Sequence, residues 1–92
     1  MMTKASMWKF PLEVRDRVVV MMPIGARILC ANVQRDVACL WALVDPDAGR
    51  EPRAFRIIGT GHEHPSGTFG RYVGTFFMAD GSLVFHVFEE ED

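Results

Sequence analysis

Short apolar runs separated by turn-forming residues are the feature that most restricts the fold of this chain. The runs follow one another at intervals of roughly 8–12 residues, a spacing typical of all-β proteins. In the first run, residues 7–14, Trp8, Phe10 and Leu12 alternate with polar residues or proline, which is the period of a half-buried strand. Pro11 cannot donate a backbone hydrogen bond, so this strand is expected at a sheet edge.

Six further runs indicate strands, and they span residues 17–23, 26–34, 37–44, 53–59, 71–79 and 83–88. We therefore expect a small antiparallel sandwich or partly open barrel of about seven strands, mainly a meander. The 92 residues suffice for one β domain, residues 1–88, followed by an acidic C-terminal tail, residues 89–92. The expected core contains Phe10, Leu12, Val19, Ile28, Leu40, Trp41, Leu43, Phe55, Ile57, Phe76, Phe85 and Val87.

The runs at 37–44, 71–79 and 83–88 are apolar on both faces. A single sheet with one solvated face cannot bury both sides of such strands. Either the strands are central in a compact fold or one face meets a partner chain, and we expect a homodimer.

The runs at 26–34 and 37–44 indicate a hairpin whose register the sequence leaves open. If the turn is centred between Gln34 and Arg35, Cys30 lies opposite Cys39. If it is centred one residue later, Cys30 lies opposite Trp41.

The net charge and the distribution of apolar residues indicate the cell compartment and the kinds of partner to expect. Twelve acidic and ten basic residues give a formal net charge of −2, which disfavours nucleic acid as a partner. Residues 1–10 lack the apolar stretch of a signal peptide, and no apolar run reaches 18 residues. We therefore expect a cytoplasmic protein that does not engage a membrane.

The glycine-rich stretch "GTGHEHPSGTFG", residues 59–70, is the most conspicuous candidate site. His62 and His64 have the spacing of a metal-ligand pair on a strand. Pro65 favours a loop instead, and no carboxylate follows His64 at the spacing that metal-binding cupin barrels use. We expect neither a metal nor another cofactor.

An anion site built from backbone N–H groups and arginines is the alternative for this stretch. A phosphate-binding P-loop does not fit, because no helix pattern and no lysine follow the glycines. The candidate ligand- or partner-binding residues are Arg53, Arg56, Gly61, His62, His64, Arg71 and Tyr72.

No arrangement of nucleophile, base and acid indicates catalysis, and we expect a protein that is not an enzyme. Ser6, Ser66 and Ser82 lack the context of an activated nucleophile. His86 stands alone in an apolar run and is expected to be a hydrogen-bonded structural residue.

Over nearly its full length the chain resembles a family of small phage- and prophage-encoded proteins of unknown function. The residues that carry this resemblance are "MWKFPLEV" at 7–14, "IGARIL" at 24–29, "CLWALVDP" at 39–46, "FRIIGTGH" at 55–62, "YVGTFFM" at 72–78 and "LVFHVFEE" at 83–90. The resemblance implies no activity, cofactor or catalytic residue, only a small protein made in the cytoplasm of a host cell.

The leading expectation for function is a non-enzymatic accessory protein that engages or inhibits a host component, with defence proteins among the candidates. The first alternative is sequestration of a small anionic nucleotide. The second alternative is a small component of the virion or of its assembly.

Overall fold

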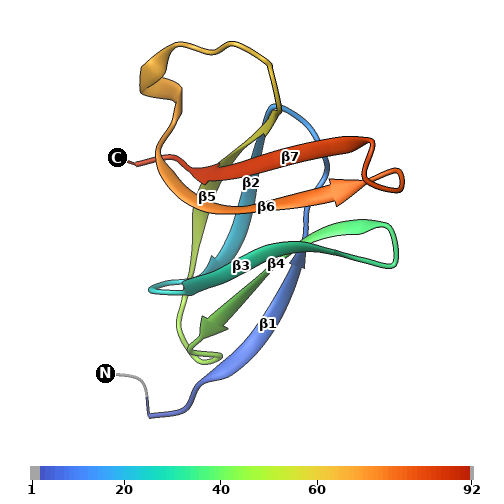
Figure 1. Cartoon of the computed structure of the whole chain (residues 1–92). Helices are drawn as coiled ribbons and strands as arrows, with labels where there is room; N and C mark the ends of the chain where they lie inside the picture. The colour runs from blue at the N-terminus through green and yellow to red at the C-terminus, as the bar shows by residue number, and fades with distance from the viewer. Residues whose placement is uncertain (1–2, 92) are drawn as a thin grey trace.

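The computed structural model describes residues 3–91 (Figure 1). Its elements are β1 (Ser6–Pro11), β2 (Arg17–Pro23), β3 (Arg27–Gln34), β4 (Val37–Val44), β5 (Arg50–Gly59), the 3₁₀ turn η1 (Ser66–Thr68), β6 (Arg71–Met78) and β7 (Leu83–Glu89). The predicted all-β fold with seven strands is confirmed. Among residues 3–91, no helix is long and apolar enough to cross a membrane.

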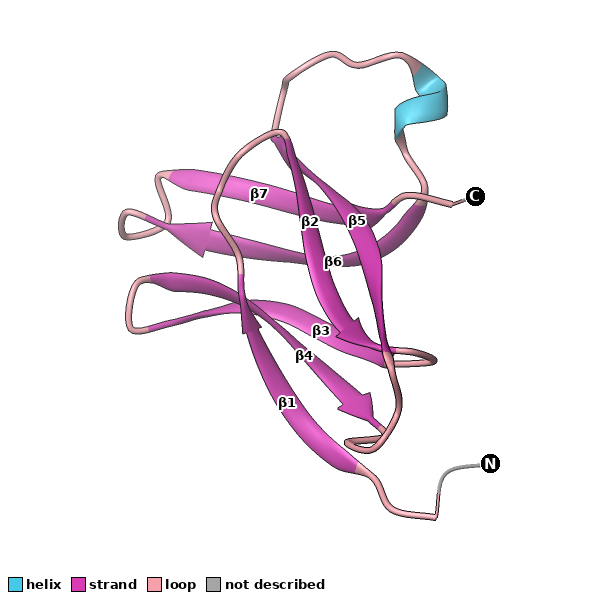
Figure 2. Ribbon diagram, turned by 180° about the vertical axis from the view of Figure 1, so that it is seen from behind, coloured by secondary structure: helices cyan, strands magenta, loops and turns pink. Residues whose placement is uncertain are grey.

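The strands form two antiparallel sheets, as the predicted sandwich requires (Figure 2). The three-stranded sheet has the order β1-β4-β3, and the four-stranded sheet has the order β2-β5-β7-β6. Side chains of both sheets share one core, in which Leu40 and Val44 of β4 pack with Phe55, Phe76 and Val87 of the other sheet.

The expectation that the strands form mainly a meander is wrong. Among the strands of residues 3–91, only the β3–β4 and β6–β7 hairpins pair strands that follow one another in the sequence. The chain crosses between the sheets from β1 to β2, from β2 to β3 and from β4 to β5, so those consecutive strands cannot pair. Their partners lie farther along the chain, as in the β1–β4, β2–β5 and β5–β7 pairs.

Most of the predicted core is confirmed. The buried members are Leu12, Leu40, Phe55, Ile57, Phe76 and Val87, and Phe10, Ile28 and Phe85 pack against them. Val19 was predicted wrongly, since it is exposed on the side of β2 that faces away from the core. Trp41 and Leu43 are half-buried and lie outside the core cluster. When a run is apolar on both faces, the sequence does not show which of its faces packs into the core.

The β3–β4 hairpin adopts the second of the two registers, with Cys30 opposite Trp41. Its turn consists of Arg35 and Asp36, which have φ values of 50° and 65°. Positive φ at both central residues is what a type I′ turn requires, although neither residue is the usual Asn or Gly. Both cysteines are free thiols; Cys39 is buried and Cys30 is exposed.

The edge strands β3 and β6 run side by side and join the two sheets without a hydrogen-bonded ladder (Figures 1 and 2). Gly74 of β6 lies against the backbone of Ala31 on β3, where a Cβ would come within 3.2 Å of the Ala31 nitrogen. A register irregularity occurs in each strand, between Ile28 and Cys30 and between Tyr72 and Gly74. Within residues 3–91, β1 and β2 remain as the outer edges of the sheets.

Candidate functional site

The glycine-rich stretch forms the loop between β5 and β6, at one end of the four-stranded sheet (Figure 1). Gly61 has a φ of +88°, a conformation that L side chains rarely adopt, and it closes the turn in which His62 N–H donates to the Gly59 carbonyl. The loop then passes through η1, where the Thr68 N–H donates to the Pro65 carbonyl. The prediction that Pro65 lies in a loop and not in a strand is correct.

The two histidines of the loop make separate contacts. The ring of His62 lies against Gly59, where a Cβ would meet its Cε1 at 3.0 Å. His64 packs edge-on against Phe69, with a centroid distance of 6.2 Å. Within residues 3–91, no three His, Cys, Asp or Glu side chains are grouped closely enough to hold a metal ion.

Arg53 lies two residues before the buried Phe55, and residues two apart in a strand share one face, so Arg53 lies on the core side of β5. Its guanidinium forms a two-pronged ion pair with Glu89 at the end of β7 and donates to the Ala26 carbonyl at 2.8 Å. Only 16% of the Arg53 side chain and 12% of the Glu89 side chain are exposed. Hydrogen bonding to Glu89 raises the pKa of Arg53 further above its usual value. Arg53 is thus largely occupied within the fold.

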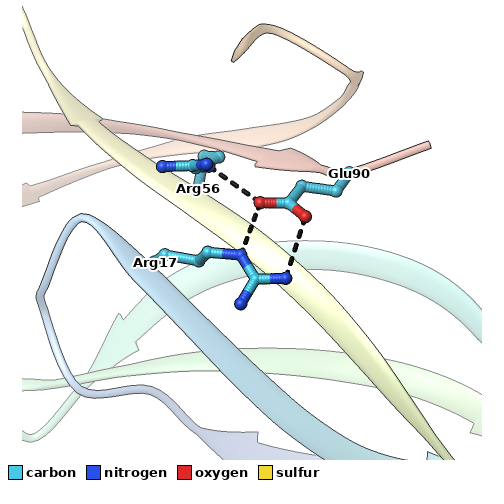
Figure 3. A network of polar contacts seen from close by, with 3 residues as sticks. All are labelled: Arg17, Arg56 and Glu90. Carbon is cyan, nitrogen blue, oxygen red and sulfur yellow. Dashed lines mark hydrogen bonds and ion pairs between the residues drawn. The ribbon is translucent and has the colours of Figure 1, made fainter. Parts of the chain in front are cut away.

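Arg56 lies on the opposite face of β5, which we call the outer face of the four-stranded sheet. Its Nε donates to Glu90 at 2.8 Å, and Glu90 also accepts two hydrogen bonds from Arg17 on β2 (Figure 3). The hydrogen bond from Arg17, followed by that from Arg56, lowers the pKa of Glu90, although burial opposes this shift. The hydrogen bond between Arg17 and Glu90 also raises the pKa of Arg17.

Sequence reasoning did not identify Glu89 and Glu90 as parts of the fold. The structure places Glu89 in β7 and Glu90 in two ion pairs, whereas Asp92 of the predicted tail lies outside the described residues. A local signal was present: Phe85, Val87 and Glu89 continue the period of two along β7. The arginines that pair with Glu89 and Glu90 lie 34 to 73 residues earlier in the chain, and no local sequence pattern indicates these contacts.

Arg53, Arg71 and Tyr72 are the predicted site residues that the structure brings together. They line one hollow between β3 and β6, together with Arg27 and Glu89. The other predicted residues, Arg56, Gly61, His62 and His64, do not line it. Arg56 instead borders a hollow beside η1 that also contains Glu90 and Glu91, whose charges oppose anion binding.

A chain of hydrogen-bonded side chains crosses the outer face from β6 to the end of β5. The Tyr72 hydroxyl lies 2.6 Å from Thr75 Oγ1, which lies 3.0 Å from His86 Nδ1. His86 Nε2 lies 2.7 Å from Thr60 Oγ1. Hydroxyl groups thus form hydrogen bonds with both ring nitrogens of His86, as expected for a hydrogen-bonded structural histidine. A threonine takes the place at Nδ1 that a carboxylate holds in Ser-His-Asp triads.

Two apolar patches lie on the outer face. The β6–β7 patch consists of Tyr72, Phe77, Val84 and Phe88 with Phe69 of the loop. Phe88 is central to it, because both Phe69 and Tyr72 pack edge-on against its ring at 5.3 and 5.5 Å. The β2 patch consists of Val19 and Met21, which are 53% and 55% exposed. β5 separates the two patches.

These features define a small two-sheet β domain with two apolar patches on the outer face of its four-stranded sheet. The chain belongs to the family described as Domain of unknown function (DUF7352), whose model matches residues 2–92. No curated protein and no solved structure matches the chain.

Proposed function

We propose that this chain is a non-enzymatic binding protein that engages a protein partner through the β6–β7 patch. The observation that supports this most is the exposure of large aromatic side chains on one sheet face: Phe77 is 62% exposed and Tyr72 is 55% exposed. Aromatic residues are enriched in the centres of protein interfaces, where they supply a large contact area. The packing of Phe69 and Tyr72 against Phe88 holds part of this patch in one conformation before binding.

The proposed partner is a component of the host cell, with defence proteins among the candidates, because the chain resembles phage- and prophage-encoded proteins. We assign recognition to the apolar patch and not to the acidic terminus. Glu89 and Glu90 are both ion-paired with arginines, so the charge of these two residues is largely compensated. An acidic surface that imitates nucleic acid would need those charges to be available.

Affinity capture from host lysate with matched variants tests this proposal. Phe77→Glu places a charge in the patch at a position that is already exposed, so folding should be preserved. Met7→Glu makes the same kind of change on β1, where the side chain is 69% exposed. The proposal expects a protein that the wild type and Met7→Glu enrich and that Phe77→Glu loses. Equal enrichment by all three proteins, or none by the wild type, contradicts it; enrichment of virion proteins instead favours a structural role in the particle.

Sequestration of an anionic nucleotide is the second candidate, and the hollow between β3 and β6 favours it. Arg27 and Arg71 line this hollow beside the Arg53–Glu89 pair, whose two charges compensate each other. Arginine forms bidentate hydrogen bonds with phosphate, so the phosphate groups of a nucleotide are what this hollow would bind.

Thermal-shift measurements with pyrophosphate and with cyclic and linear nucleotides test this second candidate. Arg71→Gln should abolish any stabilisation by these anions, whereas Arg35→Gln, in the β3–β4 turn, should retain it. Absence of stabilisation in the wild type excludes the candidate without affecting the proposal for the β6–β7 patch.

A further inference from the structure

We propose that β2 pairs with the β2 of a second copy of this chain, so that two four-stranded sheets join into one continuous sheet. The inference does not depend on the proposed function, because it uses the opposite edge of the sheet. In the order β2-β5-β7-β6, the edge strand β6 is covered by β3, whereas β2 has no strand on its outer side within residues 3–91.

Between its end residues, Arg17 and Pro23, the edge of β2 lacks the features that normally prevent strand pairing. Natural edge strands carry charges, prolines or bulges, or are very short, because their backbone N–H and C=O groups can otherwise pair with another chain. The residues of β2 between Arg17 and Pro23 are all uncharged and apolar, and the β2–β5 register runs without a shift. The other outer edge, β1, carries a charge within the strand, at Lys9.

The second copy fits this edge because β2 is complementary to itself. In an antiparallel pair centred on Val20, Val19 lies opposite Met21 of the partner subunit, and Val18 lies opposite Met22 of the partner subunit. Each face of the new pair therefore joins apolar side chains to apolar side chains. A twofold axis makes both halves of the contact identical, the usual arrangement of a homodimer. Val19 and Met21, more than half exposed in the single chain, would then be covered on the outer face.

Charge and space also permit this pairing. Arg17 would lie opposite Pro23 of the partner subunit, so the two copies of Arg17 are kept apart, and Glu90 already compensates its charge. A hollow lies along the first half of the β2 edge, lined by residues 11–13, 15 and 17–20. In the proposed pairing, this hollow receives the last residues of the partner's strand.

Sedimentation velocity over a wide range of protein concentration tests the inference. The wild type is expected to form a dimer, and Val19→Lys should weaken it at least about tenfold. The substitution places a charge opposite Met21 of the partner subunit and brings two like charges to diagonal positions on one face. Met7→Lys, an equivalent change at an exposed position of the other outer edge strand, β1, should leave dimerisation unchanged. Met21→Lys provides a second variant if Val19→Lys does not fold.

A wild type that sediments as a monomer up to millimolar concentration overturns the inference. So does a dimer that both folded β2 variants retain. Amide hydrogen exchange provides a second readout: the β2 amides should gain protection as protein concentration rises, whereas the β1 amides should not.

Discussion

Glu90 accepts two hydrogen bonds from Arg17, at 2.7 and 3.0 Å, although the two residues are 73 positions apart in the chain. The contact ties the segment after β7 to β2, and the hydrogen bond from Arg56 adds β5 to the same group (Figure 3). One carboxylate therefore links three segments at this end of the four-stranded sheet, in addition to the backbone pairing of β2 with β5 and of β5 with β7.

Acid should weaken this contact. The folded-state pKa of Glu90 is lowered from its ordinary value of 4.5, so its stabilising contribution is fully present above that pH and is lost as the pH falls through the lowered pKa. Glu90→Gln should therefore be less stable than the wild type near neutral pH, and the difference should shrink below about pH 4. Urea unfolding followed by tryptophan fluorescence checks this; a difference that stays constant down to about pH 2 contradicts it.

The Arg53–Glu89 pair should contribute more to stability, because both side chains are mostly buried. Glu89→Gln leaves the Arg53 guanidinium without its counter-charge and should lower the free energy of unfolding by roughly 2–3 kcal/mol. Glu91→Gln, at an exposed position, should have almost no effect. Chemical denaturation of both variants measures the difference, and equal stabilities would show that the buried pair contributes little.

Gly70 should tolerate no side chain. A Cβ there would lie 2.1 Å from the Glu89 carbonyl oxygen, so the backbone of the loop or of β7 must shift. Gly70→Ala should cost about 3 kcal/mol, the upper end of what overpacking usually costs. Gly67→Ala is the matched control in the same loop, because a Cβ there meets no atom within 4 Å. Thermal unfolding of the two variants should differ clearly; similar midpoints would mean that the loop does not pack closely on β7.

The β3–β4 turn should be stabilised by glycine. Asp36 has a φ of 65°, a region in which glycine carries no steric penalty. Asp36→Gly should raise the free energy of unfolding by about 0.5–1 kcal/mol, because relief of the left-handed conformation outweighs the greater freedom of the unfolded chain. A decrease in stability on urea unfolding would contradict the turn conformation.

Local sequence patterns were sufficient to locate most strands. β2 and β4 begin and end where the apolar runs predict. β5 begins at Arg50, three residues earlier than predicted, since Pro52 was interpreted as part of a loop. The strand accommodates Pro52 because β7 pairs with β5 only from Phe55 onward, so β5 has one free edge at the proline.

The arrangement of the strands and the candidate site could be predicted only in part. Pairing of β1 with β4 and of β2 with β5 depends on contacts between distant segments, and no local pattern encodes them. The seven predicted site residues were chosen for their proximity in sequence. Strand alternation then placed Arg53 and Arg56 on opposite faces of β5, where different glutamates bind them.

Photo-crosslinking at Phe77 tests the central claim, that the β6–β7 patch is the partner-binding surface, most directly. A photoreactive phenylalanine analogue in place of Phe77 retains the aromatic character of the patch, and the same analogue in place of Met7 reports on β1. In host cells we expect one discrete covalent adduct with a protein from position 77 and none from position 7. An adduct from position 7 alone, or no adduct from position 77, would contradict the account.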